Sequence, residues 1–195
     1  KFYINIQATS KRFIMKDSFE EEPWTIYKQW LKLPYSNIWQ RRLKNSLIWE
    51  QPIVKVFGRQ FLVPRKTVFL GATGISYRYS GVNHIGNGWP QWFIPLLSDV
   101  KNTCEADFNG CLLNLYRNGS DRMGWHSDNE PELDLHKPIA SLSLGAQRDF
   151  LFKHRRENIK ELLKLNSGEE CQAYYAAGLV EAGPPNSDTL IRAYS

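Results

Sequence analysis

From Pro52 onward, the sequence consists of short apolar or alternating runs that are interrupted by glycine, proline and asparagine. This pattern is typical of β-strands joined by turns, because side chains alternate between the two faces of a strand and these three residues favour turns. We therefore expect a strand-rich fold over most of the chain. The predicted strands are Ile53–Phe57, Thr67–Leu70, Ile75–Tyr79, Cys111–Tyr116, Ile139–Leu144, Phe150–Lys153 and Leu162–Leu165.

Two segments show helical spacing instead. Near the N-terminus, Ser18–Glu21 has the form of a capping box and leads into Trp24, Tyr27 and Leu31, although Pro23 leaves the start of this helix open. A helical layer followed by many short strands predicts an α+β fold with a sandwich or jelly roll at its centre. The second predicted helix interrupts the strands and carries apolar residues with a period near 3.6, at Phe93, Leu96, Leu97, Val100 and Cys104.

Length and composition favour one domain. A chain of 195 residues with 42% hydrophobic content can bury a substantial core. We expect residues 1–17 to form an irregular arm and the domain to begin at residue 18.

Charge and cysteine content narrow the environment and the partners. Lys and Arg number 25 against 20 Asp and Glu, which gives a formal charge of +5 and a moderate bias toward polyanions, although a solvated basic surface is the alternative. The cysteines number three and form no CxxC pair, which favours a reducing intracellular compartment. A helix that spans a membrane needs about 20 consecutive apolar residues, and no apolar run in the sequence approaches this length. The first residues, Lys1 to Phe13, also lack the apolar core of a signal peptide.

The segment Trp125-His126-Ser127-Asp128 contains a candidate metal site. Residues i and i+2 of an extended segment point to the same side, so His126 and Asp128 can reach one ion. An imidazole and a carboxylate in this arrangement are two thirds of the set that binds non-haem Fe(II) and leaves positions open for reactants. Taken alone, the pair also fits a hydrogen-bonded surface contact or the zinc site of a hydrolase.

The surrounding residues closely resemble the AlkB family of Fe(II)/2-oxoglutarate dioxygenases. The resemblance covers roughly residues 50–165 and is nearest to the branch that repairs alkylated bases in duplex DNA. It is carried by Val56-Phe57-Gly58, Pro64-Arg65-Lys66, Tyr77-Arg78-Tyr79-Ser80-Gly81, Asn114-Leu115-Tyr116, Gly119, Asp121, Gly124 to Glu130, Pro138 to Ala146 and Arg148-Asp149-Phe150.

The resemblance implies catalytic, metal-binding roles for two residues and cosubstrate-binding roles for two others. His126 and Asp128 would hold Fe(II), and Asn114 and Tyr116 would hydrogen-bond the cosubstrate 2-oxoglutarate. The spacing of the second pair agrees, because residues two apart on a strand share one face. For Tyr116 alone, a core aromatic is the alternative.

Four further residues are implied to contact the substrate base, which an enzyme acting on duplex DNA must extrude from the stack. Phe57, beside Gly58, would fill the gap that the extruded base leaves. Tyr77 would pack on the extracted base, and Glu130 would read its exocyclic edge. For both aromatic residues, a place in the core is the alternative.

The third iron ligand is not identified by the sequence. In the family it is a histidine far downstream, followed by a strand whose arginines hold 2-oxoglutarate. The chain has four histidines. His84 lies upstream of the motif, and His136 follows His126 too closely. His154 ends a predicted strand, at a position where relatives often carry a histidine that is not a ligand.

The residues after Gly168 depart from the family, so we expect a dioxygenase-like domain over residues 18–167 and a divergent tail over 168–195. The expected apolar strand is replaced by Glu169-Glu170-Cys171-Gln172. A loose alignment places Ala177 at the ligand position. Glu181 or Asp188 could substitute as a carboxylate ligand, and an altered C-terminus is the alternative. In the same alignment, the positions of the two arginines are taken by Thr189 and Ser195.

The resemblance implies a double-stranded β-helix (jelly-roll) core with N-terminal helices and a nucleotide-recognition hairpin. It also implies oxidative demethylation of N-alkylated bases in DNA with Fe(II), 2-oxoglutarate and O2. The alternative is an inactive module that binds damaged nucleic acid without repairing it. We expect double-stranded DNA as the partner, no membrane, a monomeric state and, in a eukaryote, the nucleus.

Overall fold

The computed structural model describes most of the chain between residues 30 and 145 and isolated strands outside it. The described residues are 2–7, 24–27, 30–56, 58–79, 81–126, 128, 131, 138–145, 148–154, 160–165, 170–175, 179–183 and 190–192. Within them, two helices and four β-sheets confirm the predicted α+β class.

The largest sheet has seven antiparallel strands in the order β1-β8-β15-β10-β13-β2, with β5 paired to β8. Strand β8 is the central element, because it pairs with both β5 and β1 and is buried along its whole length. The strands of this sheet are β1 (Phe2–Gln7), β2 (Trp24–Tyr27), β5 (Lys66–Gly71), β8 (Gly110–Leu115), β10 (Pro138–Leu144), β13 (Glu170–Tyr175) and β15 (Leu190–Arg192).

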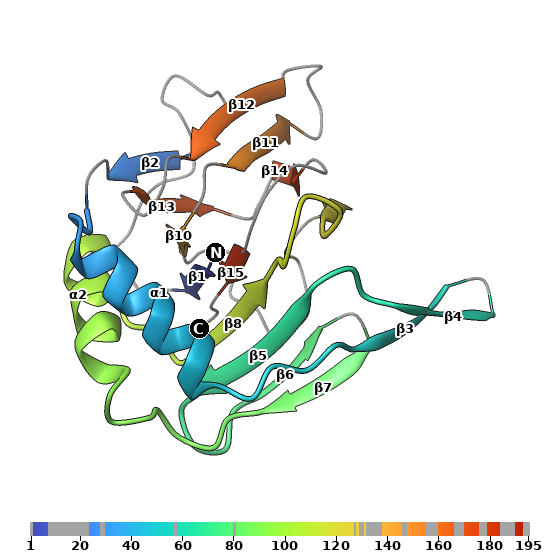
Figure 1. Cartoon of the computed structure of the whole chain (residues 1–195), viewed down its shortest axis with the longest axis horizontal. Helices are drawn as coiled ribbons and strands as arrows, with labels where there is room; N and C mark the ends of the chain where they lie inside the picture. Colours follow the sequence, from blue (N-terminus) through green and yellow to red (C-terminus); the bar gives the residue numbers. More distant parts are fainter. Residues whose placement is uncertain are drawn as a thin grey trace.

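A second sheet has four strands in the order β12-β11-β14-β9. Along the sequence, the chain crosses between the two sheets repeatedly, from β8 to β9, back to β10 and on to β11. Figure 1 shows the helices on one side of the seven-stranded sheet and the four-stranded sheet on the other. Its strands are β9 (Met123–His126), β11 (Arg148–His154), β12 (Lys160–Leu165) and β14 (Leu179–Gly183).

Two hairpins complete the described fold. The first joins β3 (Ile53–Val56) to β4 (Arg59–Leu62) and projects away from the large sheets (Figure 1). The second joins β6 (Ser76–Tyr79) to β7 (Val82–Ile85). Gly58 and Gly81 lie in the turns with φ of +77° and +79°, a conformation that glycine adopts without steric cost.

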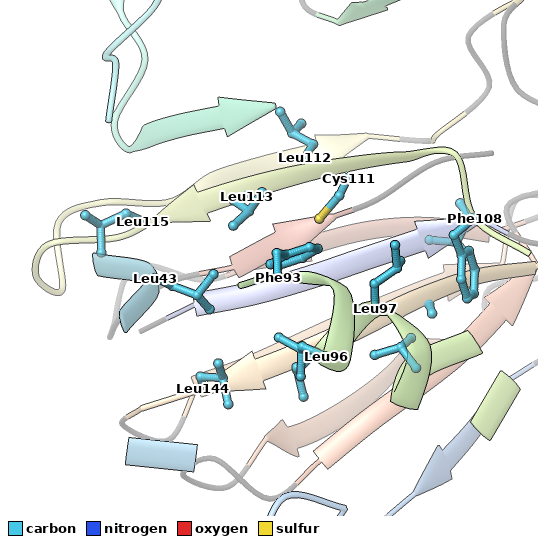
Figure 2. Packing of buried hydrophobic residues seen from close by; sticks show 14 of the residues in the cluster. Leu43, Phe93, Leu96, Leu97, Phe108, Cys111, Leu112, Leu113, Leu115 and Leu144 are labelled. Carbon is cyan, nitrogen blue, oxygen red and sulfur yellow. The ribbon is translucent and has the colours of Figure 1, made fainter. Parts of the chain in front are cut away.

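A large part of the hydrophobic core lies between the helices and the seven-stranded sheet. Helix α2 (Ile94–Cys104) follows the predicted spacing and buries Leu96, Leu97 and Val100. These side chains and Leu43 of α1 (Tyr35–Ser46) pack against the face of β8 that carries Cys111, Leu113 and Leu115 (Figure 2). Neither helix in the described part of the chain is long and apolar enough to cross a membrane.

The N-terminal predictions were wrong in two places. Residues 2–7, expected in an irregular arm, form β1, whose sequence FYINIQ ends in the apolar–polar alternation of a strand. Trp24 and Tyr27, expected on a helix, lie on β2, which pairs with β13. The residues Trp-Thr-Ile-Tyr favour strands, and here pairing with an open sheet edge outweighs the helical spacing.

The C-terminal prediction was also wrong in part, because a strand does form after Gly168. Strand β13 pairs with both β10 and β2. Strand β14 belongs to the four-stranded sheet, and β15 belongs to the seven-stranded sheet. Main-chain hydrogen bonds hold a strand whatever its side chains, so the divergent sequence does not prevent pairing. The predicted domain boundaries at residues 17/18 and 167/168 lie outside the described residues.

Candidate metal and nucleobase site

His126 and Asp128 converge at one edge of the four-stranded sheet. His126 is the last residue of β9, and its Nε2 lies 3.5 Å from Oδ1 of Asp128, a carboxylate that is only 3% exposed. The His126 Nδ1 lies 2.9 Å from the carbonyl oxygen of Gly124. If Nδ1–H donates to this carbonyl, the tautomer leaves the Nε2 lone pair facing Asp128. An Nε2 lone pair and a carboxylate oxygen facing each other favour a cation between them.

Asn114 and Tyr116 lie at the end of β8 on the face opposite the helices. Both are fully buried, at 0% and 1% exposure. Tyr3 of β1 lies opposite both Asn114 and Ser143 of β10, so these two residues share one face of the sheet. Several buried residues on this face, which also carries Leu112, are polar, whereas the other face of β8 carries Cys111, Leu113 and Leu115. The polar residues are Thr67, Asn114, Tyr116, Ser141 and Ser143.

Arg65 joins this polar face and was not recognised from the sequence as part of it. Its Nε donates a 2.6 Å hydrogen bond to Oδ1 of Asn114, and the side chain is 6% exposed. In the sequence, Arg65 counted only as part of the Pro64-Arg65-Lys66 segment that resembles the AlkB family. The two residues are 49 positions apart, so only the pairing of β5 with β8 reveals the contact.

A charged clamp fixes the loop between β8 and β9, which leads to the candidate metal ligands. Arg117 Nε and Nη2 donate to Asp121 Oδ2 and Oδ1 at 2.7 and 2.9 Å. The Asp121 Oδ2 also accepts the Arg117 backbone N–H at 2.9 Å. The hydrogen bond with Asp121 raises the pKa of the Arg117 guanidinium. A bidentate pair of this kind sets orientation as well as distance.

Tyr77 lies in the core, which agrees with the alternative assigned to it. Its side chain is 3% exposed, and its ring stacks on Phe69 with a centroid distance of 5.8 Å. His84, opposite Tyr77 on β7, packs on the same Phe69 ring at 5.6 Å. Burial lowers the pKa of His84, and the nearby Glu50 carboxylate partly opposes this change. The Tyr77 ring therefore already has an aromatic partner within the protein, Phe69.

Two of the predicted base contacts, Phe57 and Glu130, lie outside the described residues. Gly58 is described and exposed at the tip of the β3–β4 hairpin. A Cβ atom built on Gly58 would meet no atom within 4 Å apart from the neighbouring residues of the chain, so the space beside this glycine is open.

The described residues contain no group of three His, Cys, Asp or Glu side chains that could hold a metal ion. The strand register nevertheless places Glu181 of β14 directly opposite His126, next to a register shift between the two strands. Such irregularities are frequent beside active sites. Ala177 and Asp188 lie outside the described residues.

The last strand contains an arginine that the sequence alignment had not placed. Arg192 of β15 lies opposite Ser141 of β10 and Leu112 of β8. Because both residues belong to the polar face of the sheet, the register places Arg192 on that face as well. Thr189 and Ser195, the positions that the alignment had chosen, lie outside the described residues.

A family model described as the 2OG-Fe(II) oxygenase superfamily matches residues 23–172. This chain belongs to that superfamily. The chain is AlkB-like within it, as the resemblance predicted, and the cofactor and cosubstrate that the family implies are Fe(II) and 2-oxoglutarate.

Curated relatives match part of this AlkB-like chain. DNA oxidative demethylase ALKBH2 of Bos taurus is 42% identical over 106 residues, which are 52% of this chain and 37% of that protein. The Arabidopsis thaliana protein of the same name is 32% identical over 133 residues, which are 64% of this chain and 42% of that protein. Human alpha-ketoglutarate-dependent dioxygenase alkB homolog 3 is 44% identical over 91 residues, which are 45% of this chain and 30% of that protein. The chain therefore spans less than half the length of these relatives.

A solved structure supports the fold. The structure of OsALKBH1 superposes with a TM-score of 0.61, covering 89% of this chain and 96% of that one, at 15% sequence identity. This similarity concerns the fold alone.

The Arg117–Asp121 clamp can be tested through stability. Replacing Asp121 with Ala leaves Arg117 without its bidentate partner and should lower the free energy of unfolding by about 1–2 kcal/mol, since Arg117 is partly exposed. Urea denaturation measures the change. Asp107→Ala is the matched control, because its pair with Lys101 is on the surface and should change stability by less than about 1 kcal/mol. Equal effects of the two substitutions would contradict a structural clamp.

The environment of His84 predicts a pH effect. Its folded-state pKa lies below the ordinary value of 6.5, so the unfolded chain binds the proton more readily. Stability is therefore fully present above pH 6.5 and decreases as the pH falls below it, until the folded form is protonated as well. His84→Leu should reduce this decrease when urea midpoints are compared between pH 7.5 and pH 5. The same pH dependence in both proteins would show that His84 is not responsible.

Proposed function

We propose that this protein is an Fe(II)/2-oxoglutarate-dependent dioxygenase that removes alkyl groups from bases in DNA. The observation that supports this most directly is the 3.5 Å approach of His126 Nε2 to the buried Asp128 carboxylate, in a chain related to DNA oxidative demethylases. The donor set fits Fe(II), since one imidazole and one carboxylate are the ligands that non-haem iron enzymes share.

In this proposal, the residues of the chain bind and orient the reactants. His126 and Asp128 hold the iron, and the Gly124 carbonyl fixes the His126 ring by accepting a hydrogen bond from Nδ1. Asn114 and Tyr116 hydrogen-bond 2-oxoglutarate from the polar face of β8. When bound, iron and 2-oxoglutarate supply the oxidation by O2 that hydroxylates the N-alkyl group, and the adduct then releases an aldehyde and the repaired base.

Glu181 is the residue that we propose as the third ligand. Directly opposed residues of an antiparallel pair share one face and have Cβ atoms about 4.5–5.5 Å apart. The register of Glu181 with His126 supports this assignment, which spacing in the sequence alone did not. A carboxylate is an acceptable oxygen ligand for this type of ion.

The β3–β4 hairpin is the part of the molecule that we propose to enter duplex DNA. Ile53, Phe61 and Leu62 are more than half exposed on it, and Lys55 and Arg59 are charged residues on the same two strands. Apolar side chains that insert between base pairs, next to cations that contact phosphates, offset the cost of extruding a base. Phe57, beside Gly58 at the tip, would fill the gap, and Tyr77 and Glu130 would contact the extruded base.

The remaining features of the proposal concern architecture and setting. The crossing of consecutive strands between the two large sheets supports a double-stranded β-helix, or jelly-roll, core. We propose one dioxygenase domain over residues 18–167, extended by β1 and by the strands of the divergent tail, that acts as a monomer on DNA and in the nucleus of a eukaryote.

Aldehyde release tests the function. Purified protein with iron and 2-oxoglutarate should release aldehyde from duplex DNA that carries N-methylated bases, and His126→Ala should abolish the release. Absence of turnover at high protein concentration, with a cooperative unfolding transition to show that the protein is folded, would overturn the enzymatic proposal. DNA binding that weakens with salt and survives His126→Ala would then favour the binding-module alternative.

Metal affinity tests the assignment of Glu181 independently of turnover. Glu181→Ala should weaken binding of Fe(II), measured anaerobically by titration, by about 10-fold or more. Glu161→Ala is the matched control, because Glu161 lies opposite Phe152 on the far side of β11 from Glu181. Equal affinities of the wild-type protein and Glu181→Ala would exclude this residue as a ligand.

A further inference from the structure

Arg65 is a cation inside the protein. It precedes β5, and its backbone N–H donates to the Val63 carbonyl at 2.8 Å, which fixes the position of the residue. The guanidinium is always charged and carries only donors, so burial at 6% exposure requires acceptors around it. The Asn114 Oδ1, at 2.6 Å, is one of these acceptors.

This contact determines how the Asn114 amide faces. Since Arg65 Nε is a donor, the oxygen of the amide must point toward it and the amide nitrogen must point elsewhere. Among the described residues, the Asn114 Nδ2 has no hydrogen-bond partner, and the side chain is completely buried. A buried donor without a partner is unfavourable, so this site is suited to a ligand that brings an acceptor.

A second polar atom on the same face lacks a partner. Ser141 Oγ is buried and has no hydrogen-bond partner within the described part of the chain. Asn5 of β1 lies opposite both Ser141 and Leu112, and Leu112 is two residues before Asn114, so Ser141 and Asn114 are on the same side of the sheet. Two unpartnered polar groups and a buried cation on one face favour an anion with several oxygens.

We propose that Arg65 is the positioning residue of the 2-oxoglutarate site. It fixes Asn114 with its Nδ2 donor directed to the cosubstrate, and its charge offsets the cost of bringing a carboxylate into the buried polar face. This inference rests on the proposed function, because it concerns the cosubstrate of that reaction. Within the Pro64-Arg65-Lys66 segment, it assigns a role in holding the cosubstrate to Arg65 alone.

Binding of 2-oxoglutarate to the Mn²⁺-loaded protein, without DNA and without turnover, tests the inference by calorimetric titration. Arg65→Met should raise the Kd for 2-oxoglutarate by about 10- to 100-fold, as for other residues that orient a ligand-binding side chain. Arg65→Lys, which keeps the charge, should recover part of the loss. Lys66→Met is the matched control, because it removes an equal charge from the opposite face, where Lys66 lies in register with Leu115.

A second substitution keeps the test decisive if Arg65→Met does not fold. Asn114→Asp preserves size and gives Arg65 a carboxylate partner, so the protein should unfold at an equal or higher urea concentration. It nevertheless loses the Nδ2 donor and adds a negative charge, so binding of 2-oxoglutarate should be lost. The inference would be overturned if either Asn114→Asp or Arg65→Met bound 2-oxoglutarate with the affinity of the wild-type protein. It would also be overturned if the wild-type protein did not bind 2-oxoglutarate.

The outcomes also separate this inference from the proposed function. If the wild-type protein binds 2-oxoglutarate through Arg65 but releases no aldehyde from methylated DNA, the inference stands and the substrate assignment fails. If the wild-type protein and Arg65→Met both release aldehyde with the same KM for 2-oxoglutarate, the function stands and the inference fails.

Discussion

Strand β8 is buried on both faces, and the alternation of its side chains determines what each face can do. Cys111, Leu113 and Leu115 pack toward the helices, so the strand is held in place by the hydrophobic core. The intervening residues then necessarily face the other side, where Asn114 is held by Arg65. A shift of one residue in the pairing of β8 would exchange the two faces, and it would expose leucines to the site and bury an amide among leucines. The core therefore fixes the position of the candidate cosubstrate site.

The candidate metal ligands depend on a different element, the edge strand β9. Their approach requires β9 to end at His126 and the chain to continue toward Asp128, and the clamp between Arg117 and Asp121 fixes the loop that leads into this strand. The two halves of the candidate site thus belong to different sheets, which the chain connects where it crosses from β8 to β9.

The sequence predicted best where local pattern and pairing agree. The alternation in residues 111–116 and the helical period from residue 93 to residue 104 both describe segments that pack against one core, and the structure confirms them. The helix predicted to include Trp24 and Tyr27 was wrong, because over so short a segment a spacing of three or four residues is also compatible with an edge strand. The Arg65–Asn114 contact and the register of Glu181 with His126 could not be read from the sequence, since each depends on which strands become neighbours.

The projecting β3–β4 hairpin has a consequence for the protein before it meets any nucleic acid. Its apolar side chains Ile53, Phe61 and Leu62 are exposed on a two-stranded ribbon, which has few neighbours to cover its edges. Such a ribbon is a template on which another copy can add a strand, on the same surface that we propose for DNA. Lys55 and Arg59 counteract this by mutual repulsion between copies. Salt screens that repulsion, so the same ions that would weaken the proposed contact with DNA would favour association between copies.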